Sequence, residues 1–276
     1  FKSRLILSVD LYNNESDNLL ISNKIPSSTG YTNQIQNLGS IRNRGVEIIL
    51  NTVNVRTNDF SWMTDFNISF NRSKVLALYG DSELNYFIQD YNSRMGYKVE
   101  VGSPLGQYYG LIYDGIYNTG DFSQNGDGTY RLKDEVPYLK GSARASVKPG
   151  DVKYKDVAGE KDGNGLPVFS VNDRTVIGNA QPKFTGGLNN TFTYKGFDLT
   201  LFMNFVYGNQ VFNMSTQRFI GPYMANQNSV AKMANRFMLI DPQTGKEATD
   251  LQRLAALNPN QHDNSILWNI SQNNKT

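Results

Sequence analysis

A paired stretch at residues 184–207 constrains the fold more than any other, because apolar and polar residues alternate along two arms of equal length. Lys195-Gly196 lies between the arms, and the glycine supplies the positive φ that a two-residue hairpin turn needs. Such a turn places Tyr194 opposite Phe197 and the first residue of the stretch opposite the last. The alternation therefore predicts an antiparallel hairpin with one apolar face.

Aromatic residues gather at both ends of that apolar face, and aliphatic residues lie between them. A soluble sheet has no reason to carry rings at both margins, whereas the lipid-facing wall of an outer-membrane barrel has them at both interfaces. At about 3.3 Å per residue and a tilt of roughly 45°, each arm would span about 25 Å, the height of an outer-membrane apolar band. The predicted fold class is all-β, a piece of a transmembrane antiparallel β-barrel with long extracellular loops.

A second hairpin is predicted at residues 42–71. Its strands are Arg42–Val55 and Phe60–Asn71, and a short turn at Arg56–Asp59 joins them. The alternation of the first strand changes phase after Leu50, which predicts a β-bulge. Short turns that alternate with long loops are typical of outer-membrane barrels, whose periplasmic turns are short and whose external loops are long.

The rest of the chain is less regular. Ser3–Tyr12 alternates as a further strand, and a long polar connection, rich in Asn and Ser, leads from it to the next hairpin. A strand is predicted at Gln107–Tyr113, and Thr119–Gly178 is predicted to be a large folded loop. Two short helices are expected near residues 228–237 and 250–257.

Composition excludes several kinds of site. The net charge is only +2 and no basic cluster stands out in the sequence, which argues against nucleic-acid binding. The chain has no cysteine, and His262 is its only histidine, so thiolate metal sites, cysteine nucleophiles and a Ser-His-Asp triad are not expected. No apolar run approaches the roughly 18 residues of a membrane helix. No catalytic or cofactor-binding residue is therefore predicted, and the chain is not expected to be an enzyme.

Several stretches of the chain resemble the SusC/RagA group of TonB-dependent outer-membrane transporters, and they occur in the order found in that family. They are Leu38–Leu50 (LGSIRNRGVEIIL) with Asp59–Phe70 (DFSWMTDFNISF), Val101–Ile116 (VGSPLGQYYGLIYDGI), Pro149–Asp156 (PGDVKYKD) with Asn172–Gly187 (NDRTVIGNAQPKFTGG), and Tyr194–Gly208 (YKGFDLTLFMNFVYG).

The resemblance implies that residues 1–276 are the middle and C-terminal part of one 22-stranded barrel domain. The plug domain, the TonB box and the final strands would lie outside this chain, which begins without an initiator Met or a signal peptide. The resemblance also implies a multi-pass protein in the outer membrane of a Gram-negative bacterium. Its expected partners are a SusD-like surface lipoprotein, TonB, outer-membrane lipid and an oligosaccharide or peptide cargo, but no nucleic acid.

An acidic stretch at residues 156–173 resembles a calcium-loop-like segment of the same family. The candidate oxygen ligands for Ca²⁺, spaced along a glycine-bearing turn, are Asp156, Asp162, Asn164 and Asp173. The spacing departs from the family pattern, because Ala158 and Glu160 stand where Asn and Asp are expected. A weak calcium site is one hypothesis, and a solvated acidic loop without metal is the other.

Aromatic residues in loops are candidate ligand contacts, since loops held by a rigid scaffold often carry binding function. They are Tyr31, Tyr86, Phe87, Tyr91, Tyr130, Tyr138 and Tyr223. The alternative is that these rings pack against their own loops or contact the lipoprotein. A second set of polar residues is expected to line the barrel lumen, namely Arg4, Asp10, Asp65, Asn67, Asp198 and Asn204.

Two other functions compete with transport. A secreted glycan-binding β-sandwich would pack the apolar face of Phe60–Phe70 against that of Phe197–Tyr207 in a soluble monomer. A loop-decorated surface enzyme would need two carboxylates at a fixed separation or an activated nucleophile, and the sequence fixes neither.

Overall fold

The computed structural model describes residues 4–24, 28, 30, 31, 33–78, 83–87, 95–213, 219, 220 and 228–263. The chain falls into two units, each described here by itself. The first unit is Phe1–Tyr109 with Val176–Val211, and the second is Gly110–Thr175 with Phe212–Thr276.

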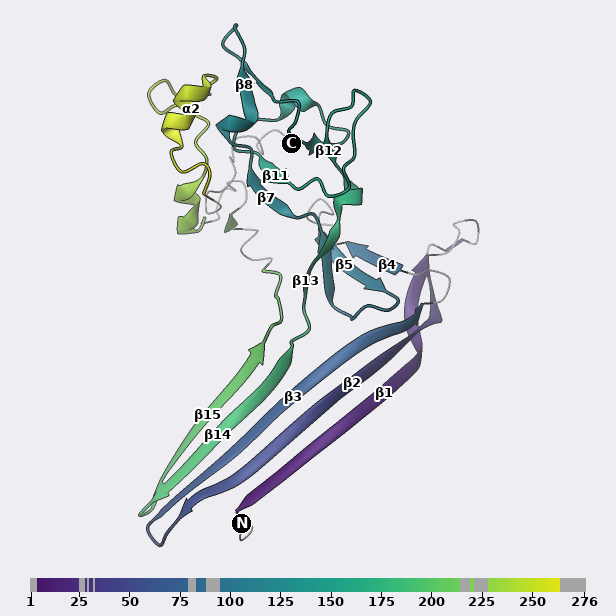
Figure 1. The fold of residues 1–276 in the computed structure, drawn as a ribbon, viewed down its shortest axis with the longest axis vertical. Coiled ribbons are helices and arrows are strands. Elements are labelled where there is room, and N and C mark those ends of the chain that lie inside the picture. Colours follow the sequence, from purple (N-terminus) through teal and green to yellow (C-terminus); the bar gives the residue numbers. More distant parts are fainter. Residues whose placement is uncertain are drawn as a thin grey trace. The chain divides into compact units, whose positions relative to one another are not determined.

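A single layer of five antiparallel strands dominates the first unit (Figure 1). In order across the sheet the strands are β1 (Leu5–Lys24), β2 (Asn33–Arg56), β3 (Phe60–Leu78), β14 (Phe184–Tyr194) and β15 (Phe197–Tyr207). β3 and β14 are neighbours in the sheet although all of 79–183 separates them in the sequence. Within the described residues β1 and β15 each pair on one side only, so this part of the sheet is open.

The β14–β15 hairpin has the predicted register. Tyr194 pairs with Phe197, and Phe184 pairs with Tyr207. Lys195 and Gly196 have φ values of 46° and 87°. Two successive positive φ angles are typical of the type I′ turn, whose twist matches that of the flanking strands.

β1 and β2 are longer than the alternation predicts. The predicted polar connection after Tyr12 is largely strand, because β1 continues to Lys24, β2 begins at Asn33, and the two strands pair along their length. Their register shifts near Asn18, which has a φ of 58°. The alternation misses this extension because polar residues occupy both faces of it, and main-chain pairing needs no apolar face.

The predicted bulge in β2 is present. The register between β2 and β3 shifts after Val53, so that Val53 pairs with Met63 and Val55 pairs with Trp62. The second strand of this hairpin is also longer than predicted, since β3 runs on to Leu78.

Two glycines in the sheet are covered by aromatic rings from the neighbouring strand. A Cβ atom at Gly186 would overlap the carbonyl oxygen of Asn67 and lie 2.5 Å from the Phe205 ring. A Cβ atom at Gly45 would likewise lie 2.5 Å from Cζ of Tyr12, whose hydroxyl reaches across Gly45 to donate a hydrogen bond to Asn71 (3.0 Å). Covering glycine with a ring in this way pins the register of adjacent strands.

The first unit also contains a four-stranded sheet of order β13-β6-β5-β4. Its strands are β4 (Glu83–Phe87), β5 (Met95–Glu100), β6 (Gln107–Gly110) and β13 (Thr175–Asn179). The strand predicted at Gln107–Tyr113 is therefore two strands. The chain leaves this sheet at Gly110 and enters a new pairing at Tyr113, the start of β7.

In its described part, the second unit contains short strands, 3-10 turns and a short helix. Its strands are β7 (Tyr113–Ile116), β8 (Phe122–Gln124), β9 (Tyr130–Leu132), β10 (Tyr138–Leu139), β11 (Val152–Tyr154) and β12 (Val168–Phe169). Its 3-10 turns are η3 (Thr119–Asp121), η4 (Arg144–Ser146), η5 (Val171–Asp173) and η6 (Ala231–Asn235). The predicted folded loop lies mostly here, around a core of Tyr117, Phe122, Leu132, Val136, Tyr138 and Val168.

A second core of this unit contains Ile116, Phe237, Leu239, Ala248 and Leu254. The helix predicted near residues 250–257 is present as α2 (Leu251–Leu257), which begins after the capping side chain of Asp250. The helix predicted near 228–237 is only the 3-10 turn η6, whose N-cap Val230 has no side-chain cap. No helix among the described residues is long and apolar enough to cross a membrane.

Candidate functional site

Alternate residues of the five-stranded sheet form one apolar face, called here the outer face. The cross-strand pairs arrange these residues in rows that run across all five strands. The central row, read from β1 to β15, consists of Leu7, Leu50, Phe66, Leu188 and Met203. Because the period of a strand is two, the whole apolar set lies on the same side of the layer.

No second layer covers the outer face within the described residues. Neither apolar core of the chain includes a residue of the five strands, and Leu7 and Met203 on the edge strands are 58% and 55% exposed. The β-sandwich hypothesis requires Phe60–Phe70 and Phe197–Tyr207 to pack face to face. They lie instead in one layer, on either side of β14, so the structure does not support a sandwich.

Aromatic rings form contacts at both ends of the outer face. Next to the short turns, Trp62 stacks on Phe192 with centroids 5.6 Å apart. At the other end, Phe184 stacks on Tyr207 (5.0 Å) and contacts Phe70 (5.8 Å). Two aromatic bands with aliphatic rows between them are typical of a barrel wall that crosses an outer membrane.

A polar cluster interrupts the outer face near its turn end. Asn190 accepts hydrogen bonds from the indole Nε1 of Trp62 (2.9 Å) and the hydroxyl of Thr64 (2.6 Å). Asn54 joins it by donating to Thr64 (2.7 Å), which it reaches because of the bulge after Val53. These groups satisfy one another, and this lowers the cost of placing them on an apolar surface. The sequence carries signals of this cluster in the phase change in β2 and in Thr64 and Asn190, which are polar residues at positions where the alternation places apolar ones.

The opposite side of the layer, called here the inner face, is polar. Asp65 accepts hydrogen bonds from Asn51 (2.7 Å) and Asn189 (3.4 Å), and Ser69 donates to Glu47 (3.4 Å). The predicted lumen residues on the five strands lie on this face by register, namely Asp10, Asp65, Asn67, Asp198 and Asn204. Arg4 precedes β1 and is exposed.

The inner face is covered at the end opposite the short turns. Ser73 and Val75 are only 6% and 1% exposed there. The backbone of Val75 bonds to that of Gly102 and Ser103, and the Ser73 hydroxyl accepts from the Leu105 amide (3.1 Å). A returning loop therefore lies against this side of the layer and not against the outer face.

Backbone N–H groups bind the carboxylates of the predicted calcium ligands. Asp173 is fully buried, and its two oxygens accept from the amides of Val157 (2.6 Å), Ala158 (2.8 Å) and Ser170 (2.6 Å). Asp156 accepts from the amide of Gly159. In the described part of the chain no three His, Cys, Asp or Glu side chains converge to hold a metal ion. The calcium site stays a prediction.

Asp162, another predicted ligand, also closes its loop. One oxygen accepts from the amides of Asn164 and Leu166 (both 2.8 Å), and the other accepts from the hydroxyl of Tyr138 (2.8 Å). These bonds, with the Leu166 amide foremost, hold the pKa of Asp162 below its usual value. The same contact is the main cause of the raised pKa of Tyr138.

Two of the predicted ligand-binding tyrosines pack inside the second unit. Tyr138 is 7% exposed and lies beside the guanidinium of Arg144 (5.2 Å). Tyr130 meets Phe122 edge to face (5.3 Å), and burial is the main reason that its pKa rises to about 12. Both rings therefore pack against residues of their own loop region, which is the arrangement given above as the alternative to ligand binding.

For the other predicted aromatic residues, the structure gives at most the exposure of a side chain or the position of the backbone. Tyr31 is 72% exposed. Tyr86 and Phe87 belong to β4, where only the backbone is described, and Tyr91 and Tyr223 lie outside the described residues. Ligand binding by the predicted rings stays a prediction.

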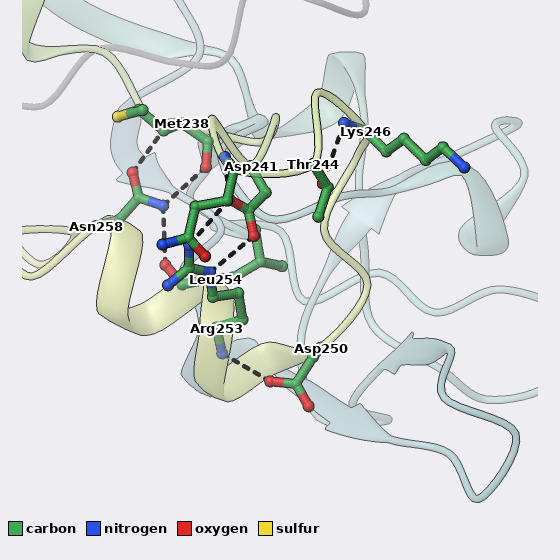
Figure 2. A network of polar contacts seen from close by, with 9 residues as sticks. Met238, Asp241, Thr244, Lys246, Asp250, Arg253, Leu254 and Asn258 are labelled. Atoms are coloured by element: carbon green, nitrogen blue, oxygen red, sulfur yellow. Dashed lines mark hydrogen bonds and ion pairs between the residues drawn. The ribbon is translucent and has the colours of Figure 1, made fainter.

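A polar network fixes α2 against the segment before it (Figure 2). Arg253 donates from Nε and Nη2 to both carboxylate oxygens of Asp241 (2.8 and 2.9 Å), and this pair is the main cause that lowers the pKa of Asp241 to about 2. Asn258 accepts from the amide of Met238 (2.7 Å) and donates to the carbonyl groups of Met238 and Leu254 (2.9 Å each). The network is satisfied internally and holds the shape of this loop.

No protein-family model matches the chain. Among curated proteins it is similar to TonB-dependent receptor P3 of Formosa agariphila, with 34% identity over 241 residues, or 85% of this chain and 21% of the relative. It is also similar to TonB-dependent receptor SusC of Bacteroides thetaiotaomicron, with 31% identity over 151 residues, or 50% of this chain and 15% of the relative. The chain thus spans about a fifth of the length of the first of these receptors and a smaller share of the second.

The fold is similar to part of a solved transporter. A structure of the RagAB peptide transporter matches 90% of this chain and 24% of its own, with a TM-score of 0.60 and 21% identity. The RagAB peptide importer in its closed-closed state matches with a TM-score of 0.59 and 20% identity, over 91% of this chain and 24% of its own. The single-layer sheet described above is therefore a known arrangement of strands.

Proposed function

We propose that this chain, which belongs to the SusC/RagA type of TonB-dependent receptors, forms part of the wall of an outer-membrane importer. The family was predicted from the sequence. It is confirmed by relatives named TonB-dependent receptor and by a fold shared with the RagAB transporter. The complete wall is a closed 22-stranded barrel in this proposal.

One observation supports the proposal most. The layer has an uncovered apolar outer face with an aromatic band at each end, and a polar inner face. From Phe60 to Phe70, ten residues at about 3.3 Å each and a tilt of roughly 45° give a height of about 23 Å, close to that of an outer-membrane apolar band. In this proposal the outer face contacts lipid and the inner face borders the lumen.

The proposed cargo is an oligosaccharide or a peptide, and the proposed partners are a SusD-like surface lipoprotein and TonB. Support comes from the relative named SusC and from the RagAB structures, whose titles describe a peptide transporter and importer. The lipoprotein acts as a lid that delivers cargo to the loops, and movement of a plug then opens the lumen. The chemistry is binding and gated passage without a covalent step.

Labelling at two adjacent positions tests the placement in the membrane. In the complete receptor that carries this segment, Met203→Cys lies on the outer face and Asn204→Cys on the inner face. A fluorophore at position 203 should be quenched by brominated lipid, whereas one at position 204 should be quenched by iodide from the aqueous side. Aqueous quenching alone at both positions, or a receptor that fractionates without detergent, refutes the proposal.

Uptake tests the cargo. Cells that carry the receptor and its neighbouring lipoprotein should accumulate labelled oligosaccharides or peptides, and should lose this uptake when TonB is deleted. Uptake that persists without TonB would contradict the energised mechanism.

A further inference from the structure

Four basic side chains lie on the outer face directly beyond its aromatic band at the loop end. Arg44 pairs with Arg72, and Arg42 pairs with Lys74. On β3, Arg72 and Lys74 continue the alternation of Phe70 and so share its face. Arg42, Arg44, Arg72 and Lys74 are called here the basic patch.

Both pairings bring like charges directly opposite each other, which destabilises an antiparallel pair. Glu15 lies 4.0 Å from Arg42 and offsets only part of this charge, and β1 changes register soon after it, beyond Ser16. Arg44 and Lys74 have no ion-pair partner among the described residues. Local conflicts of this kind are expected at functional sites, and the group that would relieve a repulsion between cations is an anion.

The hydrogen bonds of the patch leave donors free. Arg72 uses Nη1 to donate to the carbonyl groups of Asn71 and Lys183 (2.8 and 2.9 Å), which orients its guanidinium. Within the described part of the chain, the Nε atom of Arg42 is shielded from solvent and has no partner. The patch therefore contains an oriented guanidinium and a second one with an unused donor.

The position of the patch favours lipid over a loop as its occupant. The returning segment at Gly102–Leu105 covers Ser73 and Val75 on the inner face, whereas Arg72 and Lys74 point to the other side and are exposed. These two cations lie two and four residues beyond Phe70, or about 5 and 9 Å further along the barrel axis. That distance matches the headgroup layer just outside the hydrocarbon core.

We propose that the basic patch binds phosphate groups of anionic lipid in the outer leaflet of the outer membrane. This inference rests on the proposed function, because it needs the outer face to contact lipid. Guanidinium groups suit phosphate oxygens through charge-assisted, two-pronged hydrogen bonds. Each cation near an anionic membrane surface is expected to strengthen binding about five-fold.

The test uses the complete receptor in neutral detergent, titrated with diphosphoryl lipid A and followed by native mass spectrometry. The variant Arg44→Gln/Arg72→Gln/Lys74→Gln should bind diphosphoryl lipid A on the order of 100-fold more weakly than the parent. Lipid A freed of its phosphates should bind parent and variant equally weakly. Inorganic phosphate at 10-fold excess over lipid should not displace it, because the acyl chains contribute to binding at the outer face.

Two control variants separate this role from others. Lys161→Gln/Lys232→Gln/Lys246→Gln removes the same charge from exposed positions elsewhere in the chain and should leave lipid binding within about two-fold. The variant Arg44→Lys/Arg72→Lys keeps the charge and should retain most of the affinity of the parent for diphosphoryl lipid A. The single variant Arg44→Gln should bind lipid A about five-fold more weakly without lowering the melting temperature in neutral detergent, since it removes a repulsion.

The outcomes distinguish the inference from the proposed function. A receptor in the outer-membrane fraction whose patch variant binds diphosphoryl lipid A like the parent overturns the inference alone. Displacement of lipid by inorganic phosphate, or loss of lipoprotein binding with unchanged lipid binding, also overturns it. A receptor that does not fractionate with the outer membrane refutes the proposed function whatever its affinity for lipid.

Discussion

A pair of adjacent substitutions in β2 measures which face of the sheet meets lipid. Leu50 lies in the central row of the outer face between Leu7 and Phe66, while Ile49 lies on the inner face between Ser8 and Asn67. Both are aliphatic residues of β2, which has a neighbour on each side, so hydrophobicity alone predicts the same cost for Leu50→Arg and Ile49→Arg. The facing of the two side chains predicts different costs.

The magnitude follows from the depth of each residue. Leu50 pairs with Phe66, which is six residues from Phe60 at the turn end and four from Phe70 at the loop end. At about 3.3 Å per residue and roughly 45° of tilt, this places Leu50 about 14 Å and 9 Å from the two aromatic bands, near the middle of the apolar layer. An arginine there is expected to cost about 2–4 kcal/mol. At Ile49, which is 41% exposed on the inner face, it should cost less than about 1 kcal/mol.

The assay is reversible unfolding of the complete receptor in lipid vesicles by guanidinium chloride, with the free energy of unfolding compared among parent, Leu50→Arg and Ile49→Arg. The same variants folded in neutral micelles control for a general effect of arginine on β2. Equal losses at the two positions, or a larger loss at Ile49, would refute the assignment of the outer face to lipid.

Four further outcomes are expected. Gly186→Ala should lower the free energy of unfolding, measured by denaturant titration, by about 1–3 kcal/mol, because the new Cβ atom would overlap the Asn67 carbonyl oxygen and the Phe205 ring. The control Gly126→Ala, where the Cβ atom would lie in open space, should have little effect in the same titration. Asn190→Ala should cost about 1–3 kcal/mol by leaving the Trp62 and Thr64 donors without their acceptor, and a cost no greater than that of the inner-face control Thr191→Ala would contradict the polar cluster. The pKa of Asp241 is lowered by its pair with Arg253, so the pair stabilises the fold fully above about pH 4 and this stabilisation is lost as pH falls through about 2. Hydrogen-exchange protection of α2 should therefore drop between pH 4 and pH 2 in the parent. It should not drop in this range in Asp241→Asn. The calcium hypothesis predicts heat of binding in a calorimetric titration at millimolar calcium, smaller in Asp162→Asn, and a titration without heat would remove the hypothesis.

The wall of this chain was predictable from the sequence where one face is apolar and the other polar. The β14–β15 register and the β2 bulge follow from a period of two and a two-residue turn. The extension of β1 and β2 towards Lys24 and Asn33 was not predictable in this way, since its side chains carry no alternation and only main-chain pairing defines it.

The candidate sites were less predictable than the wall. Tyr138 and Asp162 are far apart in the sequence, and only the fold shows that they hydrogen-bond to each other. The basic patch was also not predictable from the sequence, because its residues come together only in the folded sheet. Arg42 and Arg44 are near in sequence, but they become a patch only when β3 brings Arg72 and Lys74 opposite them.

The direct pairing of β3 with β14 has a consequence for the evolution of such receptors. β3 ends at Leu78 and β14 begins at Phe184, so residues 79–183 are an insertion between two neighbouring strands of the wall. The second unit has its own apolar cores, which include no residue of those strands. Substitutions, deletions and additions within this insertion can therefore accumulate without changing the main-chain hydrogen bonds that join β3 to β14.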